Sequence, residues 1–291
     1  MKLKRYILFS TVCIALMGMT SCFQDMDQDP AFDYPPEYVP EESPLKVYIP
    51  FEDKDKNMSN YRYSITTINE DYIDGHIGKA FQGSDGAYII ATPPASLTEA
   101  IVNLGSFTYS FWMNSPRNEA VQGILSIAKK DHSRGYLELY FENNNNGNQA
   151  YIKGFMRTVP KEGNPKETWI DVGSVQPEGS SRVENVWNKW THLAFRYDGS
   201  TSTISIFRDG EAVLLNRVLG GGTFGPLAFD PAFCDGKIVF GAFAAVAGQS
   251  TGKQDAWVVN SKTMSGQYDQ IRFYNQALSD NEIKALYTSK E

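Results

Sequence analysis

Among the acids of this sequence, two glutamates on one strand-like segment have the spacing that most resembles the carboxyl pair of a hydrolytic enzyme. Glu138 and Glu142 enclose the triplet Leu-Tyr-Phe, so both point to the same face of an extended strand. Hydrolysis of a glycosidic bond needs carboxyls about 5 to 5.5 Å apart for retention and about 6.5 to 9.5 Å for inversion. Four residues of strand separate these two by roughly 13 Å. The spacing therefore predicts that this pair does not hydrolyse glycosides, while a pair assembled from distant strands stays open.

Histidines and cysteines offer little other chemistry. His76, His132 and His192 are far apart in sequence and form no His-Glu-x-x-His pattern, which a zinc hydrolase of that type requires. His192 fits a packed strand position better than a general base. Cys234 has no His or Lys beside it in sequence, so we expect a small buried apolar group and not a reactive thiol.

Tryptophans on polar segments are the best candidates for ligand contact. Trp169 and Trp257 lie in stretches rich in Lys, Glu, Gln, Asp, Gly and Pro, which we interpret as loops. A large flat ring on such a loop can stack on a sugar face at small entropic cost. Trp187, between asparagines, is a third candidate, and Arg157 could donate hydrogen bonds at the edge of the site. Local packing of each tryptophan is the alternative.

The first residues are typical of a secretion signal. Lys2, Lys4 and Arg5 precede an apolar run from Tyr6 to Met17, which is shorter than the roughly 20 residues that a membrane-spanning helix needs. The sequence Met-Thr-Ser-Cys that ends at Cys22 resembles the lipobox of bacterial lipoproteins. We expect residues 1–21 to be a signal peptide and Cys22 to carry the lipid that holds the protein on a membrane.

The mature chain is acidic. The signal removes three of the 27 Lys and Arg and none of the 34 Asp and Glu, so 24 basic residues face 34 acidic ones and the net charge is −10. Nucleic acid is an unfavoured partner because phosphate binding rests on concentrated positive charge. Residues 22–44 form a lipidated linker rich in proline and acid, and its start resembles the surface-export signals of Gram-negative lipoproteins.

Short aromatic and β-branched runs separated by Gly, Asn and Asp predict an all-β domain over residues 45–291. In the strand that begins at Trp190, alternation places Leu193, Phe195 and Tyr197 on one face. Turns follow at Asp198-Gly199 and at Asp209-Gly210, the second suited to a tight hairpin. A capping box, Ser279 with Glu282, predicts a short C-terminal helix.

Four motifs in order carry a specific resemblance. They are KAFQGSDGAYI from Lys79, SFTYSFWM from Ser106, WTHLAFRYDG from Trp190 and YDQIRFYNQALS from Tyr268. Together they resemble a laminin-G-like domain of the concanavalin A-like lectin and glucanase superfamily. The resemblance implies a jelly-roll sandwich of two antiparallel sheets with a short C-terminal helix, which binds ligands on a concave face or at its rim.

The same resemblance implies a cofactor. Some relatives hold a structural calcium, and Glu52, Asp53, Asp85 and Asp269 supply hard oxygen ligands at motif positions that the family fold brings together. The alternative is that these acids belong to turns and strand ends. No other cofactor is expected.

The fold alone does not decide the function, because it hosts lectins, glycosidases and adhesion modules. Lipoproteins of this family often belong to polysaccharide-uptake systems, so we favour a non-catalytic glycan-binding protein that is anchored in the outer membrane, exposed at the cell surface and associated with transporter proteins. The alternative is a protein-binding adhesion module. A glycoside hydrolase is less favoured, because the Glu-x-Asp-x-x-Glu string of hydrolytic relatives does not occur.

Overall fold

The computed structural model describes residues 43–52, 63–143, 147–171 and 177–289. The predicted signal peptide, Cys22, Asp53 and nearly all of the predicted linker lie outside these ranges. The described residues belong to one compact unit, Glu42–Glu291. In these ranges no helix is both long and apolar enough to cross a membrane.

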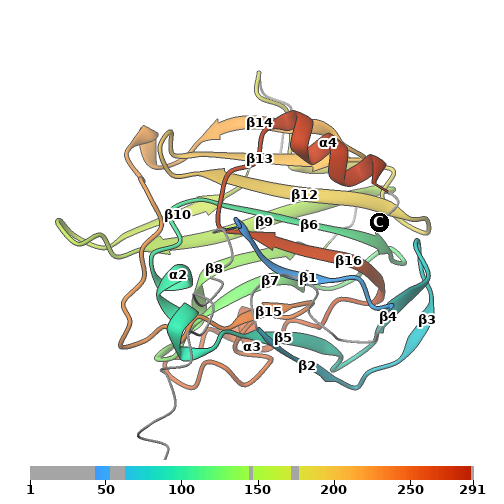
Figure 1. Ribbon diagram of the computed structural model, residues 1–291, viewed down its shortest axis with the longest axis horizontal. Coiled ribbons are helices and arrows are strands. Elements are labelled where there is room, and N and C mark those ends of the chain that lie inside the picture. The colour runs from blue at the N-terminus through green and yellow to red at the C-terminus, as the bar shows by residue number, and fades with distance from the viewer. Residues whose placement is uncertain (1–42, 53–62, 144–146, 172–176, 290–291) are drawn as a thin grey trace, which may run out of the picture. The chain divides into compact units, whose positions relative to one another are not determined.

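Two antiparallel sheets make up the domain (Figure 1). In sheet A, as far as the described residues go, the strand order is β14-β13-β12-β6-β16-β4-β3, and β1 also pairs with β16. The strands of sheet A are β1 (Leu45–Ile49), β3 (Tyr72–Asp74), β4 (Lys79–Gly83), β6 (Phe107–Asn114), β12 (Thr191–Asp198), β13 (Thr203–Arg208), β14 (Glu211–Val218) and β16 (Gly266–Tyr274).

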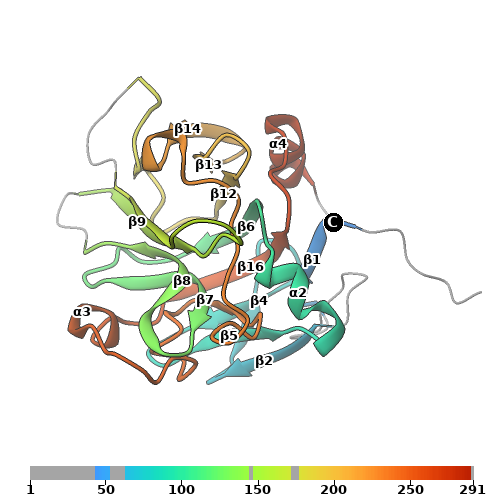
Figure 2. The same cartoon turned by 90° about the vertical axis from the view of Figure 1, so that its left-hand side faces the viewer.

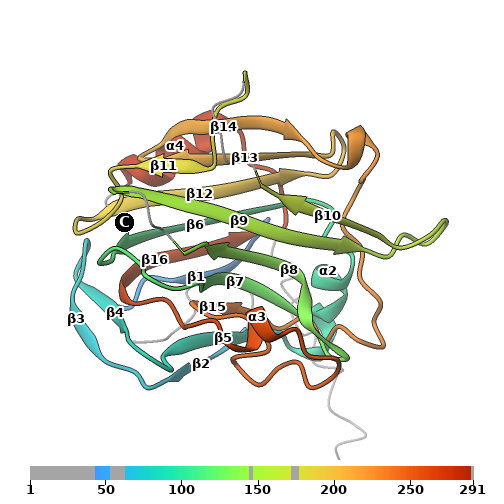
Figure 3. The same cartoon turned by 180° about the vertical axis from the view of Figure 1, so that it is seen from behind.

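Sheet B lies behind sheet A in Figure 1 and in front of it in Figure 3. Its described strands follow the order β10-β9-β8-β7-β15-β5-β2, and β11 also pairs with β9. They are β2 (Ser64–Ile68), β5 (Tyr88–Thr92), β7 (Gln122–Lys129), β8 (His132–Phe141), β9 (Gln149–Thr158), β10 (Lys166–Ile170), β11 (Arg182–Glu184) and β15 (Ile238–Phe240).

The hydrophobic core lies between the two sheets and is rich in aromatic rings. Tyr109 of β6 lies 5.5 Å, centroid to centroid, from Phe240 of β15, so the two sheets touch through these side chains. Leu193, Phe195 and Tyr197 of β12 all point into this core, as the alternation in the sequence predicts. The all-β two-sheet sandwich is therefore confirmed.

Helices cover parts of both outer faces (Figure 2). The C-terminal helix α4 (Asp280–Thr288) lies against sheet A, where Ile283 packs on Ala194 and Phe207. Ser279 and Glu282 form the predicted capping box, because each side chain binds the backbone N–H of the other. The remaining helical segments are short: η1 (Ala95–Leu97), α2 (Thr98–Val102), η2 (Gly220–Gly222) and α3 (Ala256–Val259).

The hairpin between β13 and β14 follows the local sequence. Asp209 and Gly210 have φ values of 51° and 76°, and Arg208 pairs with Glu211 across the turn. Two consecutive residues with positive φ make the turn type whose twist matches that of the strands. The predicted Asp-Gly hairpin is therefore confirmed.

A long connection from Gly241 to Ser265 covers part of the outer face of sheet B and carries α3, which lies in front of this sheet in Figure 3. Ala242 and Ala244 of this connection pack on Ile90 and Val239 of the sheet. The connection also bonds to β8 through the backbone, since Ser133 N donates to Lys253 O. The outer face of sheet B is thus covered next to β7 and β15, while β10 at its edge stays open.

Candidate functional site

Trp169 lies on the edge strand β10. The sequence suggested a loop, and this prediction is wrong, because Lys166–Ile170 pairs in register with β9 and alternates as a strand does. Ile170 is buried in the core, so Trp169 points to the outer face. Its indole covers Phe155, the residue opposite it on β9, at 5.0 Å between centroids, and 44% of Trp169 stays exposed.

Trp257 lies on α3, the single helical turn of the covering connection. Its neighbour Val258 is buried in a small cluster with Tyr140 of β8 and Phe243. This anchor holds the indole of Trp257 against Tyr140, at 5.5 Å between centroids, with 37% of the residue exposed. A buried residue thus fixes an exposed ring.

The structure brings Trp169 and Trp257 together. Their ring centroids are 6.0 Å apart and their planes are tilted by 46°. We call this pair the aromatic platform. It joins residues 88 positions apart in sequence, and two flat groups stacked on it would be rotated relative to one another.

Two residues that support the platform were not predicted from the sequence. Phe155 is fully buried beneath Trp169, and the guanidinium of Arg134 lies 5.1 Å from the Phe155 ring and 5.8 Å from that of Trp169. Arg134 Nε also binds Asp255 at 2.5 Å, which ties β8 to the residue before α3. The alternation of Lys153, Phe155 and Arg157 is the signal that could have revealed this outer face.

Further ion pairs flank the platform on β9 and β10. Arg157 is buried and binds Glu167, the residue opposite it, through Nε at 2.7 Å and Nη2 at 2.6 Å. On the other side of Phe155, Lys153 binds Glu142 at 3.1 Å and Asp171 at 3.6 Å. Each of these cations therefore has an acidic partner.

Glu138 is fully buried on β8 beside Phe155. Its Oε1 accepts a hydrogen bond from Gly135 N at 2.7 Å, and burial raises the pKa of this carboxyl well above its usual value. Glu142 instead pairs with Lys153. The two glutamates are therefore in different environments, one buried and one paired with a lysine.

Trp187 does not belong to the platform. It is 5% exposed, packs edge-on against Phe141 at 5.2 Å, and donates from Nε1 to the carbonyl of Gln149 at 3.1 Å. With both its ring and its N–H satisfied inside the protein, it offers no face to a ligand. The prediction that Trp187 contacts ligand is corrected to a packing role.

The predicted calcium ligands are only partly together. Glu52 accepts from Lys79 N at 3.3 Å and Asp269 accepts from Ile77 N at 2.9 Å, so both lie against the turn between β3 and β4. Burial and the nearby charge of Glu52 raise the pKa of Asp269 to about 6. Asp85 is 3.8 Å from Lys262 instead.

A calcium ion takes six to eight oxygen ligands. Among the described residues no group of three His, Cys, Asp or Glu is placed to hold a metal ion, and Asp53 lies outside them. The carboxylate of Asp269 is already occupied by backbone N–H donors from Ile77 and Gln270. Calcium binding therefore stays a prediction.

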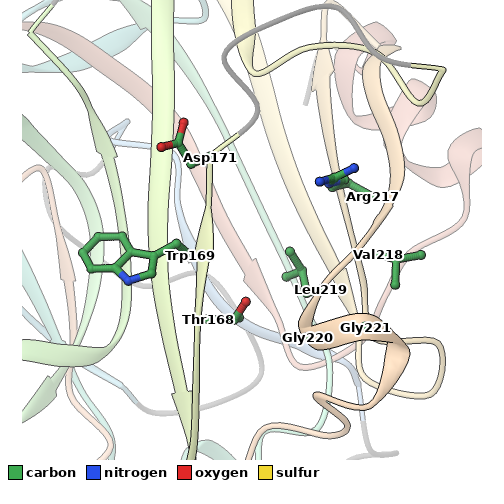
Figure 4. A pocket seen from close by; sticks show the side chains of 8 residues that line it. All are labelled: Thr168, Trp169, Asp171, Arg217, Val218, Leu219, Gly220 and Gly221. Atoms are coloured by element: carbon green, nitrogen blue, oxygen red, sulfur yellow. The ribbon is translucent and has the colours of Figure 1, made fainter.

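A small slot of about 280 Å³ lies on the other side of β10 from the platform (Figure 4). Thr168 and Leu219 point toward one another across it, whereas the indole of Trp169 points to the opposite side of the strand. The slot therefore opens between β10 and β14, at the edges of the two sheets, and Trp169 contributes to its lining while its indole faces the platform.

Comparison with known proteins identifies the family. Residues 84–284 match the model of a laminin G family, described as the concanavalin A-like lectin/glucanases superfamily. The chain belongs to this laminin G family. A comparison with curated proteins gives no match.

Solved structures share the laminin G-like fold at low identity. Domain 4 of AbnA, an extracellular arabinanase from Geobacillus stearothermophilus in complex with arabinotriose, has a TM-score of 0.51 and 16% identity over 85% of this chain and 100% of that domain. The Botulinum neurotoxin serotype G binding domain has a TM-score of 0.52 and 14% identity, over 85% of this chain and 51% of that one. The binding domain of Botulinum neurotoxin DC in complex with SialylT has a TM-score of 0.53 and 12% identity, over 86% and 52%.

Proposed function

We propose that this chain is a non-catalytic carbohydrate-binding lipoprotein that captures a polysaccharide or oligosaccharide through the aromatic platform. The observation that carries the proposal is the pair of exposed indoles, held 6.0 Å apart on the outer face of sheet B by buried neighbours. Sugar rings have apolar faces edged by hydroxyls, so stacked aromatics with polar groups at their sides suit them. The arabinotriose complex of a domain with this fold supports the same reading.

Replacement of the platform residues tests this proposal. Trp169→Ala and Trp257→Ala should each weaken retention in affinity electrophoresis gels containing arabinan, xylan, glucomannan or β-glucan, and the double variant should abolish it. Val259→Ala, at an exposed residue on the same helical turn, is the matched control and should bind as the parent does. Unchanged retention of the folded double variant would contradict the proposal.

A binding protein without hydrolytic chemistry should leave the polysaccharide intact. Burial keeps Glu138 from solvent and Lys153 pairs with Glu142, which supports this expectation. Incubation with each retained polysaccharide should release no reducing ends. A steady increase in reducing ends that scales with the amount of protein would show that the chain is an enzyme.

The lipid anchor is the part of the proposal that rests on the sequence. We propose that Cys22 is acylated and that the domain is held at the outer surface of the outer membrane, where it would pass glycan to transporter proteins. Labelling cells with a palmitate analogue should mark the parent chain, and Cys22→Ser should lose both the label and the membrane fraction. Labelling of the Cys22→Ser variant would exclude this site of lipidation.

Protein binding is the second candidate function, and one observation favours it. Strand β14 is an edge of sheet A, and Leu215 and Val218 on it are 38% and 51% exposed. The backbone of β14 already bonds to residues 178–180, since Ser180 N donates to Val213 O and Leu215 N donates to Glu178 O, but its exposed apolar side chains can pack against another protein. If no glycan is retained, crosslinking at the cell surface from residues on β14 should recover a protein partner.

A further inference from the structure

Two adjoining cavities lie beyond the aromatic platform. The first, which we call the side pocket, has a volume of about 370 Å³ and includes His132, Arg157 and Glu167 in its lining. The second, which we call the end groove, has a volume of about 640 Å³ and lies beside α2. Val159 and Asp230 line both, so the two cavities adjoin. Their volumes lie in the range of small-molecule sites.

The side pocket begins where the platform ends. Arg157 on β9 lies opposite Glu167 on β10. This pair is two residues further along the strands than the pair Phe155 and Trp169, and its side chains point to the same outer face. Two residues of a strand span about 7 Å, so Arg157 lies about 7 Å along β9 from Phe155. Val159 is four residues from Phe155, which corresponds to about 13 Å. A chain molecule that leaves the platform along β9 therefore enters the side pocket first and the end groove next.

The side pocket supplies polar groups suited to hydroxyls. Arg157 is tied to Glu167, but its Nη1 is buried and has no hydrogen-bond acceptor among the described residues. His132 accepts from Arg134 N through Nδ1 at 3.1 Å, so the neutral ring carries its proton on Nε2. A buried donor without a partner costs free energy that a ligand oxygen would recover.

The end groove is more apolar. Val102, Pro160, Phe229 and Pro231 contribute to its lining, while Asn103 and Lys161 add polar groups. A sugar ring has apolar faces and polar hydroxyls at its edge. An apolar surface with a few polar groups therefore suits it, as the platform does. The order along β9 thus places the platform first, the side pocket next and the end groove last.

We propose that the side pocket and the end groove bind further residues of the same glycan that stacks on the aromatic platform, so that the ligand is an extended polysaccharide chain. This inference rests on the proposed function. Besides the platform, the glycan would then contact a second binding region, which comprises residues 95–103, 157–167 and 228–231. Affinity should then depend on chain length.

Blocking the end groove tests the inference. Ala95 and Asn103 are exposed and line the groove, so Ala95→Trp and Asn103→Trp should each fill it without disturbing the core. Ser96→Trp, at the exposed neighbour that does not line the groove, is the matched control. Calorimetric titration would use graded oligosaccharides of arabinan, xylan, glucomannan and β-glucan.

In the parent and in Ser96→Trp, affinity should rise by about tenfold from the trisaccharide to long oligosaccharides and then level off. In the two blocked variants this gain should vanish, while trisaccharide affinity changes less than about twofold. If the blocked variants keep the full gain and the platform variants still lose binding, the end groove is not a binding region and the proposed function stands. If the parent binds no glycan of any length, both proposals fail.

Discussion

Burial divides the tryptophans more sharply than their sequence neighbours do. Trp169 and Trp257 keep 44% and 37% of their surface exposed, whereas Trp112 and Trp187 keep 5% each. The sequence around Trp187 is as polar as that around Trp257, so no local pattern separates a packing ring from an exposed one. What separates them is tertiary: Phe141 and Gln149, which are distant in sequence, enclose Trp187.

Stability measurements should separate these two roles. Trp187→Ala should lower the free energy of unfolding by about 3 to 5 kcal/mol, because it leaves a cavity in the core. Trp169→Ala should lower it by about 1 kcal/mol or less, because its ring lies at the surface. Urea unfolding followed by circular dichroism measures both. Equal losses for the two variants would contradict the assignment of Trp187 to the core.

Glu138 should make the fold less stable at high pH. Burial raises its pKa in the folded state, so the unfolded chain loses this proton first as the pH rises above the usual glutamate value. In that window the unfolded state binds fewer protons, and stability falls by up to about 1.4 kcal/mol per pH unit until the raised pKa is reached.

Glu138→Gln should remove this pH dependence and raise the urea midpoint at neutral pH. Glu142→Gln is the matched control, since Glu142 pairs with Lys153 at a partly exposed position and the variant leaves Glu138 in place. Midpoints are measured between about pH 6.5 and 8, above the raised pKa of Asp269, which would otherwise contribute a slope of the same sign. A parent slope that persists in Glu138→Gln would assign the effect to another group.

The sequence predicted the elements that depend on neighbouring residues, such as a helix cap or a tight turn. It did not predict the elements that depend on pairing between strands. The capping box at Ser279 and the turn at Asp209-Gly210 depend on residues within three positions of one another, and both are confirmed. Strand β10 is five residues long, follows a polar turn, and exists because β9 pairs with it. The sequence therefore identified the two platform tryptophans but not the strand, the covering connection or the contact between them.

The cap of α4 should contribute measurably to stability. Ser279→Ala removes the side-chain oxygen that accepts from Glu282 N, which typically costs about 1 kcal/mol. Because Ile283 of α4 is fully buried against sheet A, the loss should appear in global unfolding. Urea unfolding of this variant beside Ser96→Ala, at an exposed serine, checks it. No difference between the two variants would mean that the helix unfolds independently.

The ion pair between Arg134 and Asp255 should matter more for binding than for stability. Asp255→Ala removes the side-chain contact that ties the start of α3 to β8, so Trp257 is held less firmly and retention should fall severalfold. A partly exposed pair of this kind contributes at most about 1 kcal/mol to folding. Asp280→Ala, which breaks the Arg196–Asp280 pair on the sheet A side, should leave retention unchanged. Loss of retention in both variants would indicate a general effect of unfolding.

Charge acts at the scale of the whole molecule. The expected mature chain has a net charge of −10, and the cations Arg134, Lys153 and Arg157 around the platform each pair with a carboxylate. Uronic-acid polysaccharides would therefore be repelled at long range and find no free cation among these three. This balance favours a neutral glycan.

Salt should consequently have little influence on binding. Raising the ionic strength to about 1 M shortens the screening length to about 3 Å, which weakens charge-driven association but not ring stacking. The dissociation constant for a neutral oligosaccharide should change by less than about twofold. Polygalacturonate and alginate should not be retained at any salt concentration. Tight, salt-sensitive retention of either would show that the charge argument is wrong.

The 6.0 Å spacing of the two platform indoles also gives the protein an optical signature. Two identical chromophores at that separation, with planes tilted by 46°, couple their electronic transitions and should add a paired positive and negative band to the ultraviolet circular dichroism spectrum. Either single alanine variant would erase this couplet. Saturation by an unlabelled sugar would alter it, so occupancy could be followed without an immobilised ligand.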